Sequence, residues 1–146
     1  MKCVEIMTKD PVFCLPSDTV QKVARLMKDE DVGPIPVVDA ETTRKLMGIV
    51  TDRDLAVRVV AEGRNPSTTT VQEVMTTSAI SCIADDDVRK GLNAMAENQV
   101  RRIPVVDDNG RLVGIIAQAD IATRIDEPEK TAELVQEISK VAGTGN

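Results

Sequence analysis

The chain has 146 residues, 42% of them apolar and 29% charged, and a formal net charge of −6, values typical of a globular protein. It contains no histidine, tryptophan or tyrosine, and Phe13 is its one aromatic residue. A catalytic Ser-His or Cys-His pair and a histidine-bearing zinc site are therefore excluded. We do not expect nucleic acid as a partner, because single-strand binders use stacking aromatic side chains and a negative chain repels phosphates.

The N-terminal region and the cysteines indicate the compartment. Lys2, Glu5 and Lys9 interrupt any apolar run that could serve for export, and no segment approaches the length of a membrane span. Cys14 and Cys82 are flanked by apolar residues, which favours small buried hydrophobic side chains over a disulfide. We expect a cytoplasmic protein with reduced thiols and no membrane contact.

In the first half of the chain, the apolar run 12–15 is too short for a helix and predicts a strand. Pro16, Ser17 and Asp18 then supply N-cap residues for a helix whose apolar stripe begins at Val20. A buried hairpin and a closing helix follow, at 35–38 with 45–50 and at about 52–61.

The second half begins after a linker at 62–70 that is rich in Gly, Pro, Ser and Thr. Asp108, Asn109 and Gly110 form a strong turn signal between two apolar strands. The predicted elements are a strand at 80–83, a helix capped by residues 85–87, a hairpin at 103–106 with 112–116, a helix at 118–124 and a last helix from 126.

These two series of elements come from a repeat. Residues 7–39 and 75–107 align without a gap at an offset of 68, and 13 of the 33 paired positions are identical. The match then resumes at an offset of 66, so that Asp54 recurs as Asp120. A tandem duplication explains the pattern. One copy buries too little surface to be firmly stable alone, so we expect the copies to pack on each other about a pseudo-twofold axis.

The most informative segment is 48–54, where a buried strand runs straight into a helix. Thr51 and Asp54 have the spacing of a capping box, in which each side chain accepts the backbone amide of the other residue. In the second copy Ala117 replaces the threonine, whereas the acid is kept as Asp120. An acid kept without its capping partner indicates another task, but the helix dipole also favours an acid there. These residues alone leave both interpretations open.

The openings 6–8 and 74–76, the blocks 32–39 and 100–107, and the junctions 48–54 and 114–120 occur in the same order twice. Together they resemble the CBS domain family, a regulatory module, over roughly residues 4–124. The resemblance implies an α+β fold of two tandem β-α-β-β-α units. The expected boundaries are 4–62 for the first CBS domain, 63–71 for the linker, 72–125 for the second CBS domain and 126–142 for a C-terminal helix.

The resemblance also implies clefts between the paired domains that bind adenosine-containing ligands. Asp54 and Asp120 would accept ribose hydroxyls, and Thr51 would lie near phosphate. Arg101 and Arg102 would contact phosphate in the second cleft, whereas for Arg53 and Arg58 phosphate contact and surface ion pairing stay open. The expected ligand-binding residues are Val12, Gly33, Pro34, Ile35, Thr51, Arg53, Asp54, Ile80, Arg101, Arg102, Ile103, Ala117 and Asp120.

We therefore expect a regulatory sensor that binds AMP, ADP or ATP as a ligand, has no cofactor, metal or catalytic residue, and signals to an unidentified effector protein. S-adenosylmethionine is the alternative ligand, because it shares the adenosine half. Other hypotheses are a ligand-free interaction module and an enzyme that uses Asp52, Asp54 or Cys14. The enzyme is the weakest, because the two acids lack a third metal ligand. Apolar stripes on the helices predict a homodimer.

Overall fold

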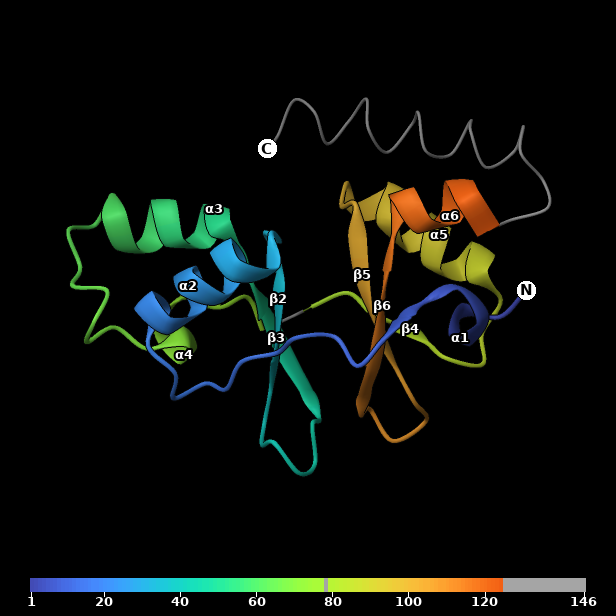
Figure 1. Ribbon diagram of the computed structural model, residues 1–146, viewed down its shortest axis with the longest axis horizontal. Coiled ribbons are helices and arrows are strands. Elements are labelled where there is room, and N and C mark those ends of the chain that lie inside the picture. Colours follow the sequence, from blue (N-terminus) through green and yellow to red (C-terminus); the bar gives the residue numbers. More distant parts are fainter. Residues whose placement is uncertain (78, 125–146) are drawn as a thin grey trace. The chain divides into compact units, whose positions relative to one another are not determined.

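The computed structural model describes residues 1–77 and 79–124 (Figure 1). They form two compact units. The first-repeat unit is Val12–Ala79, and the second-repeat unit combines Met1–Pro11 with the chain from Ile80 onward. Helices and paired strands occur in both units, which confirms the α+β class. The helix expected at 126–142 lies outside the described residues.

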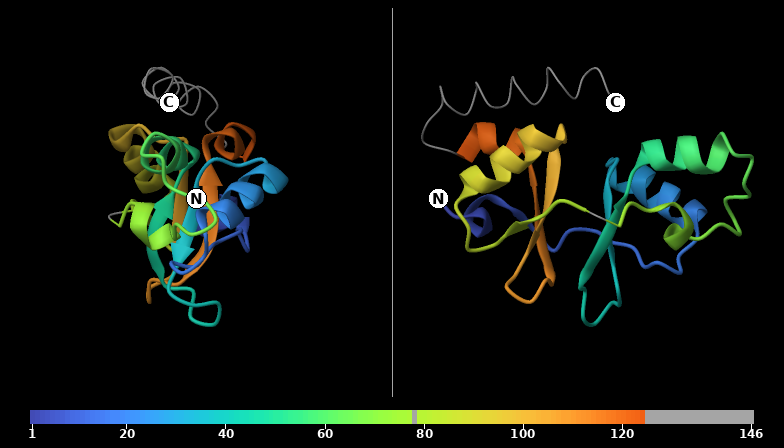
Figure 2. Two further views of the ribbon diagram at one scale, coloured as in Figure 1. Left: turned by 90° about the vertical axis from the view of Figure 1, so that its left-hand side faces the viewer. Right: turned by 180° about the vertical axis from the view of Figure 1, so that it is seen from behind.

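A hairpin and its covering helices make up the first-repeat unit. Strand β2 (Ile35–Val38) pairs antiparallel with β3 (Leu46–Val50), and in Figures 1 and 2 the helices α2 and α3 lie on the same side of this hairpin. The helices are α2 (Val20–Glu30), α3 (Asp52–Leu55), its π-helical continuation η1 (Ala56–Val60), and α4 (Val71–Val74).

The strand predicted at 12–15 is reduced to one residue pair. Cys14 forms an isolated parallel bridge with Val37, in which its amide donates to Pro36 O at 3.0 Å and its carbonyl accepts from the Val38 amide at 3.0 Å. The run lies between Pro11 and Pro16, and proline has no amide hydrogen to extend a ladder. The prediction of a strand over residues 12–15 is therefore wrong in length, because only Cys14 is paired.

The helix α2 is capped by a residue outside the predicted capping segment 16–18. Thr19 is the N-cap, and its Oγ1 accepts the Lys22 amide at 3.2 Å. Asp18, an expected cap, instead accepts the Leu15 amide at 2.9 Å. The acid thus closes the turn before the helix and leaves the capping position to the following threonine.

The second-repeat unit contains a four-stranded sheet in the order β1-β6-β5-β4. Strand β4 runs parallel to β5, and the other pairs are antiparallel. Asp87 caps the long helix by accepting the Arg89 amide at 2.9 Å, within the predicted capping segment. The elements are α1 (Cys3–Ile6), β1 (Thr8–Lys9), β4 (Cys82–Ile83), α5 (Val88–Asn98), β5 (Arg102–Val106), β6 (Leu112–Ala117) and α6 (Gln118–Arg124).

Each repeat's opening packs on the other repeat. Thr8 in β1 pairs with Ile115 of the second repeat, and its counterpart Thr76 bridges to Ile49 of the first. A Cβ atom on Gly48 would collide with the Thr76 carbonyl oxygen, so glycine permits this close approach. The compact units therefore interleave along the chain, whereas the predicted boundaries at 4–62 and 72–125 follow the repeats.

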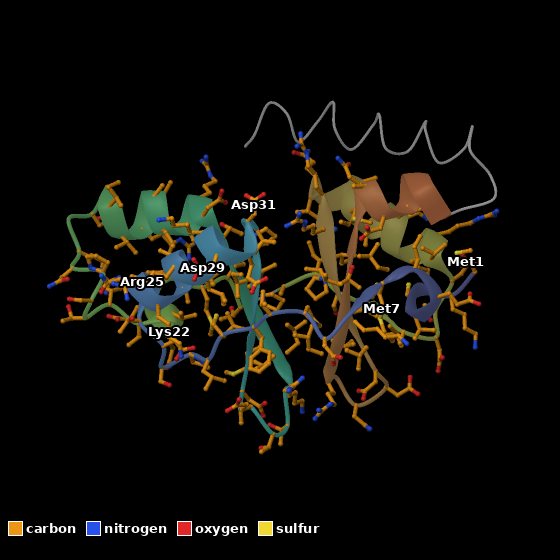
Figure 3. All side chains as sticks on the ribbon, in the orientation of Figure 1. Met1, Met7, Lys22, Arg25, Asp29 and Asp31 are labelled. Carbon is orange, nitrogen blue, oxygen red and sulfur yellow. The ribbon has the colours of Figure 1, made fainter. Side chains whose placement is uncertain are left out.

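Each unit has its own core of aliphatic and sulfur-containing side chains. In the first-repeat unit, Ile35, Val37 and Val50 pack with the buried face of α2. In the second, Ile103, Ile116 and Met95 pack with residues from the N-terminal segment, including Met7 (Figure 3). Because the hairpins are anchored in these cores, the loops and helix starts at their ends have fixed positions.

Candidate functional site

The first-repeat edge, residues 33–35 with 51–54, lies where the hairpin meets a helix. Ile35 pairs with Val50, so the loop before β2 and the start of α3 reach the same end of the hairpin. A Cβ atom on Gly33 would lie 3.1 Å from Asp52 Oδ1. The glycine therefore allows the loop backbone to approach an acid at the helix start, and the sequence pattern did not single out this acid as a loop contact.

Thr51 and Asp54 form the complete capping box. Thr51 Oγ1 accepts the Asp54 amide at 3.1 Å, and Asp54 Oδ2 accepts the Thr51 amide at 2.9 Å. The Asp54 side chain is 14% exposed. The capping interpretation is thus confirmed, and it leaves Oδ1 of Asp54 as the oxygen available for a second partner.

That partner within the chain is Arg58, whose role the sequence left open. Its Nε lies 3.9 Å from Asp54 Oδ1, and one of its terminal nitrogens donates to Val74 O at 2.9 Å and to Met75 O at 3.4 Å. The i, i+4 spacing of the two residues was the signal that could have predicted this ion pair. Arg58 therefore connects the acid to the C-terminal end of α4.

Arg53, by contrast, lies exposed on the first turn of α3. Its amide donates to Asp52 Oδ1 at 3.0 Å. Arg53 is the neighbour of Asp54 in the chain, and its side chain is exposed to solvent.

The apolar members of the first set divide by burial. Ile35 is fully buried in the core, so its side chain belongs to the packing of the hairpin. Val12 and Pro34 are partly buried, and Val12 packs against the core cluster that contains Ile35. Val12 thus adds a partly exposed aliphatic side chain to the core cluster of this unit.

The second-repeat edge, residues 101–103 with 117–120, repeats this arrangement. Arg102 pairs with Ala117 across β5 and β6, and the Gln118 amide donates to Arg101 O at 2.9 Å. The loop before β5 is therefore hydrogen-bonded directly to the start of α6. Ala117 offers no capping hydroxyl, in contrast to Thr51.

The predicted ligand-binding residues of the second-repeat edge differ in solvent exposure. Arg101 is exposed and Arg102 is half-buried, whereas Ile103 is fully buried. Asp120 is partly buried in the first turn of α6. Ile80 packs on the core cluster that contains Ile103, as Val12 does in the first-repeat unit. The thirteen predicted residues are thus grouped into two corresponding sets, one in each unit.

A separate groove of about 530 Å³ lies along α2 in the first-repeat unit. Lys22, Arg25 and Asp29, labelled in Figure 3, belong to its lining together with Phe13 and Glu41. The groove mixes both signs of charge, and its lining does not include the residues predicted to bind the ligand.

Nucleophilic chemistry at Cys14 is disfavoured by its surroundings. Burial raises the pKa of the Cys14 thiol to about 12, with a smaller contribution from nearby Asp18, so the thiol stays protonated at neutral pH. Within residues 1–77 and 79–124, no three His, Cys, Asp or Glu side chains gather as a metal site. The described helices include none that is long and apolar enough to cross a membrane.

Comparison with known proteins identifies the repeat. The sequence pattern of the CBS domain family matches residues 3–61 and 71–127 of this chain. The chain is 38% identical over 135 residues to the CBS domain-containing protein YhcV of Bacillus subtilis, covering 92% of this chain and 93% of that one.

Two solved structures have the same fold. Hypoxic response protein I, solved with two coordinated zinc ions, is 32% identical with a TM-score of 0.78, over 86% of this chain and 99% of that one. The CBS domain pair of protein MJ0100, solved with 5′-methylthioadenosine and S-adenosyl-L-methionine, is 28% identical with a TM-score of 0.72, over 84% and 94%. The chain therefore belongs to the CBS domain family and carries two CBS domains in tandem.

Proposed function

We propose that this chain is a regulatory sensor that binds an adenosine-containing nucleotide, AMP, ADP or ATP, at its repeat edges and signals to a partner protein. The observation that carries the proposal is the recurrence of one arrangement: a carboxylate in the first turn of a helix, beside a loop held close to that helix start. It occurs at Asp54 and again at Asp120.

The chemistry of the first-repeat edge suits a nucleoside. Asp54 Oδ1 can accept ribose hydroxyls if the Arg58 side chain, whose Nε lies 3.9 Å from this oxygen, moves aside. Thr51 Oγ1 accepts the Asp54 amide, so its hydroxyl hydrogen is left to donate to a phosphate oxygen. With Phe13 as the one aromatic residue, the purine would rest on aliphatic surface such as Val12.

The second-repeat edge has an aspartate, Asp120, at the position of Asp54, but the residues around it differ. Arg101 and Arg102 replace Gly33 and Pro34, which adds positive charge where phosphates are expected. We assign the more highly phosphorylated ligands to this edge, because guanidinium groups bind phosphate oxygens strongly.

S-adenosylmethionine is the second candidate. The MJ0100 CBS pair was solved with this compound and with 5′-methylthioadenosine, both of which contain adenosine. The acid at each helix start would serve either ligand class in the same way, whereas the two arginines favour phosphate.

The ultraviolet spectrum and thermal unfolding test the proposal together. The chain has no tryptophan or tyrosine, so adenine retained through purification would dominate its absorbance, and chromatography of the acid-released compound would identify it. A ligand at 100 times its Kd stabilises the folded state by about 2.7 kcal/mol. If no adenine compound is retained and millimolar AMP, ADP, ATP and S-adenosylmethionine all leave the melting temperature unchanged, the chain is a ligand-free interaction module.

A further inference from the structure

Two of the three cysteines meet inside the second-repeat unit. Cys3 comes from α1 and Cys82 from β4, and their side chains are 0% and 5% exposed. A Cβ atom on Gly91 of α5 would lie 3.5 Å from Cys82 Sγ and 3.8 Å from Cys3 Sγ. Both sulfur atoms therefore occupy one small space against the glycine.

Backbone hydrogen bonds hold α1 at this place. The Cys3 amide donates to Asp86 O at 2.9 Å, and the Val4 amide donates to Ala84 O at 2.9 Å. Both acceptors follow β4 directly, so the helix that carries Cys3 is fixed to the strand that carries Cys82. The thiols are neighbours because of this anchoring, although 79 positions separate them in the sequence.

The other repeat shows what this space holds without a thiol pair. At the repeat offset of 68, Cys82 corresponds to Cys14, but Cys3 corresponds to Val71 and Gly91 to Val23. Cys14, Val71 and Val23 all belong to the core of the first-repeat unit. The second-repeat unit thus has a second sulfur where its sibling has an aliphatic side chain, and a glycine beside it where its sibling has Val23.

The two thiols have separate backbone partners: Cys3 Sγ donates to Asp87 O at 3.9 Å, and Cys82 Sγ donates to Pro104 O at 3.9 Å. The interaction with Cys82 lowers the pKa of Cys3, whereas the same interaction and burial raise the pKa of Cys82. The thiolate is the nucleophilic form of cysteine. Cys3 is the attacking sulfur of the proposed pair because its helix of four residues opens locally at lower cost than the sheet that holds Cys82, and Cys82 then resolves the intermediate.

We propose that Cys3 and Cys82 are a reversible redox site, in which a peroxide converts the two thiols to a disulfide that pins α1 to β4. Cys3 sulfur attacks hydrogen peroxide, the O–O bond breaks, and a sulfenic acid and water form. Cys82 sulfur then attacks the Cys3 sulfur, the S–O bond breaks, and a second water leaves with the thiol proton. The cysteines lose two electrons in total, and a dithiol such as dithiothreitol returns them.

Access for the peroxide comes from the position of Cys3. It lies in a helix of only four residues, and so short a helix opens locally at low cost. The disulfide removes that freedom. Because residues 1–11 belong to the second-repeat unit, oxidation holds α1 on β4 within that unit, independently of ligand binding.

Thiol counting on the purified full chain tests the site. The reduced protein is treated with hydrogen peroxide, denatured, alkylated and mapped by mass spectrometry. We expect the free thiols to fall from three to one per chain, with a Cys3–Cys82 cross-linked peptide, with Cys14 alkylated, and with all three restored by dithiothreitol.

Two variants separate pairing from general oxidation. Cys3→Val inserts the residue that the sibling unit carries at Val71, so it should fold, as circular dichroism checks, and should form no disulfide. Cys14→Ala should lose two thiols as the wild type does. Three thiols that remain free after peroxide treatment, irreversible oxidation without a cross-link, or a cross-link that involves Cys14 would each overturn the proposal.

Discussion

Replacement of Asp54 separates its structural role from its proposed role in binding. The carboxylate caps α3 through the Thr51 amide, 2.9 Å away, and is 14% exposed. Asp54→Asn keeps an oxygen for that amide and removes the charge, whereas Asp54→Ala removes both. Hydrogen bonds to charged groups contribute about 1.5–3 kcal/mol, so both variants should weaken adenosine-ligand binding at the first-repeat edge by roughly 10- to 150-fold.

Stability should respond differently. Asp54→Ala leaves the Thr51 amide without its acceptor and should lower the free energy of unfolding by about 1 kcal/mol. Asp54→Asn should lose less, because the amide oxygen of asparagine still accepts that hydrogen bond. Chemical denaturation measures these differences, and isothermal titration calorimetry with AMP and ATP measures the affinities.

The chain supplies a matched control in Asp18. Its side chain is 15% exposed and accepts the Leu15 amide at 2.9 Å, but it lies in the turn before α2 and lines the groove along that helix instead of the first-repeat edge. Asp18→Asn should therefore leave affinity unchanged. Wild-type affinity in a folded Asp54→Asn protein, or an equal loss in Asp18→Asn, would refute the assignment of Asp54 to the ligand.

Three further predictions concern the sites, the packing and the assembly. The two edges should bind unequally: ATP should prefer the second-repeat edge, and its affinity there should fall as salt rises, whereas two equivalent salt-insensitive sites in calorimetry would contradict this. Gly48→Ala should lower the free energy of unfolding by about 1–3 kcal/mol, because its Cβ collides with the Thr76 carbonyl. Gly91→Ala, with 3.5 Å to its nearest neighbour, should leave this free energy unchanged or raise it by up to about 1 kcal/mol, and equal melting of both variants would refute the packing account. The chain should form a homodimer through an apolar surface that includes Val60, which is 76% exposed; light scattering should give more than the monomer's 15.8 kDa and should return to that mass in Val60→Lys.

The repeat made much of the fold predictable. Helices α2 and α5 have apolar stripes long enough to recognise, and the hairpins are bounded by turn residues. Thr51 and Asp54 have a spacing that predicts their mutual hydrogen bonds, which the structure contains. These features are local, so a single stretch of sequence contains all the residues that form them.

The remaining features depend on contacts between distant residues. The exchange of openings was not predicted, because α1 and α4 have only four residues each and no periodicity can show on which repeat they pack. Cys3 lies near Cys82 for the same reason, because the N-terminal segment packs on the second repeat. The i, i+4 spacing could indicate the ion pair of Arg58 with Asp54, but the hydrogen bonds of Arg58 to Val74 O and Met75 O join positions that no motif links.

Amide chemical shifts measured by NMR during an AMP titration are the sharpest test of the proposal that the ligand binds at the repeat edges. We expect the shifts to concentrate at residues 33–35 and 51–54 and at residues 101–103 and 117–120, and we expect Asp54→Asn to abolish the first group. Shifts confined to the groove along α2, at residues such as Phe13 and Lys22, would contradict it. So would a spectrum that millimolar AMP leaves unchanged.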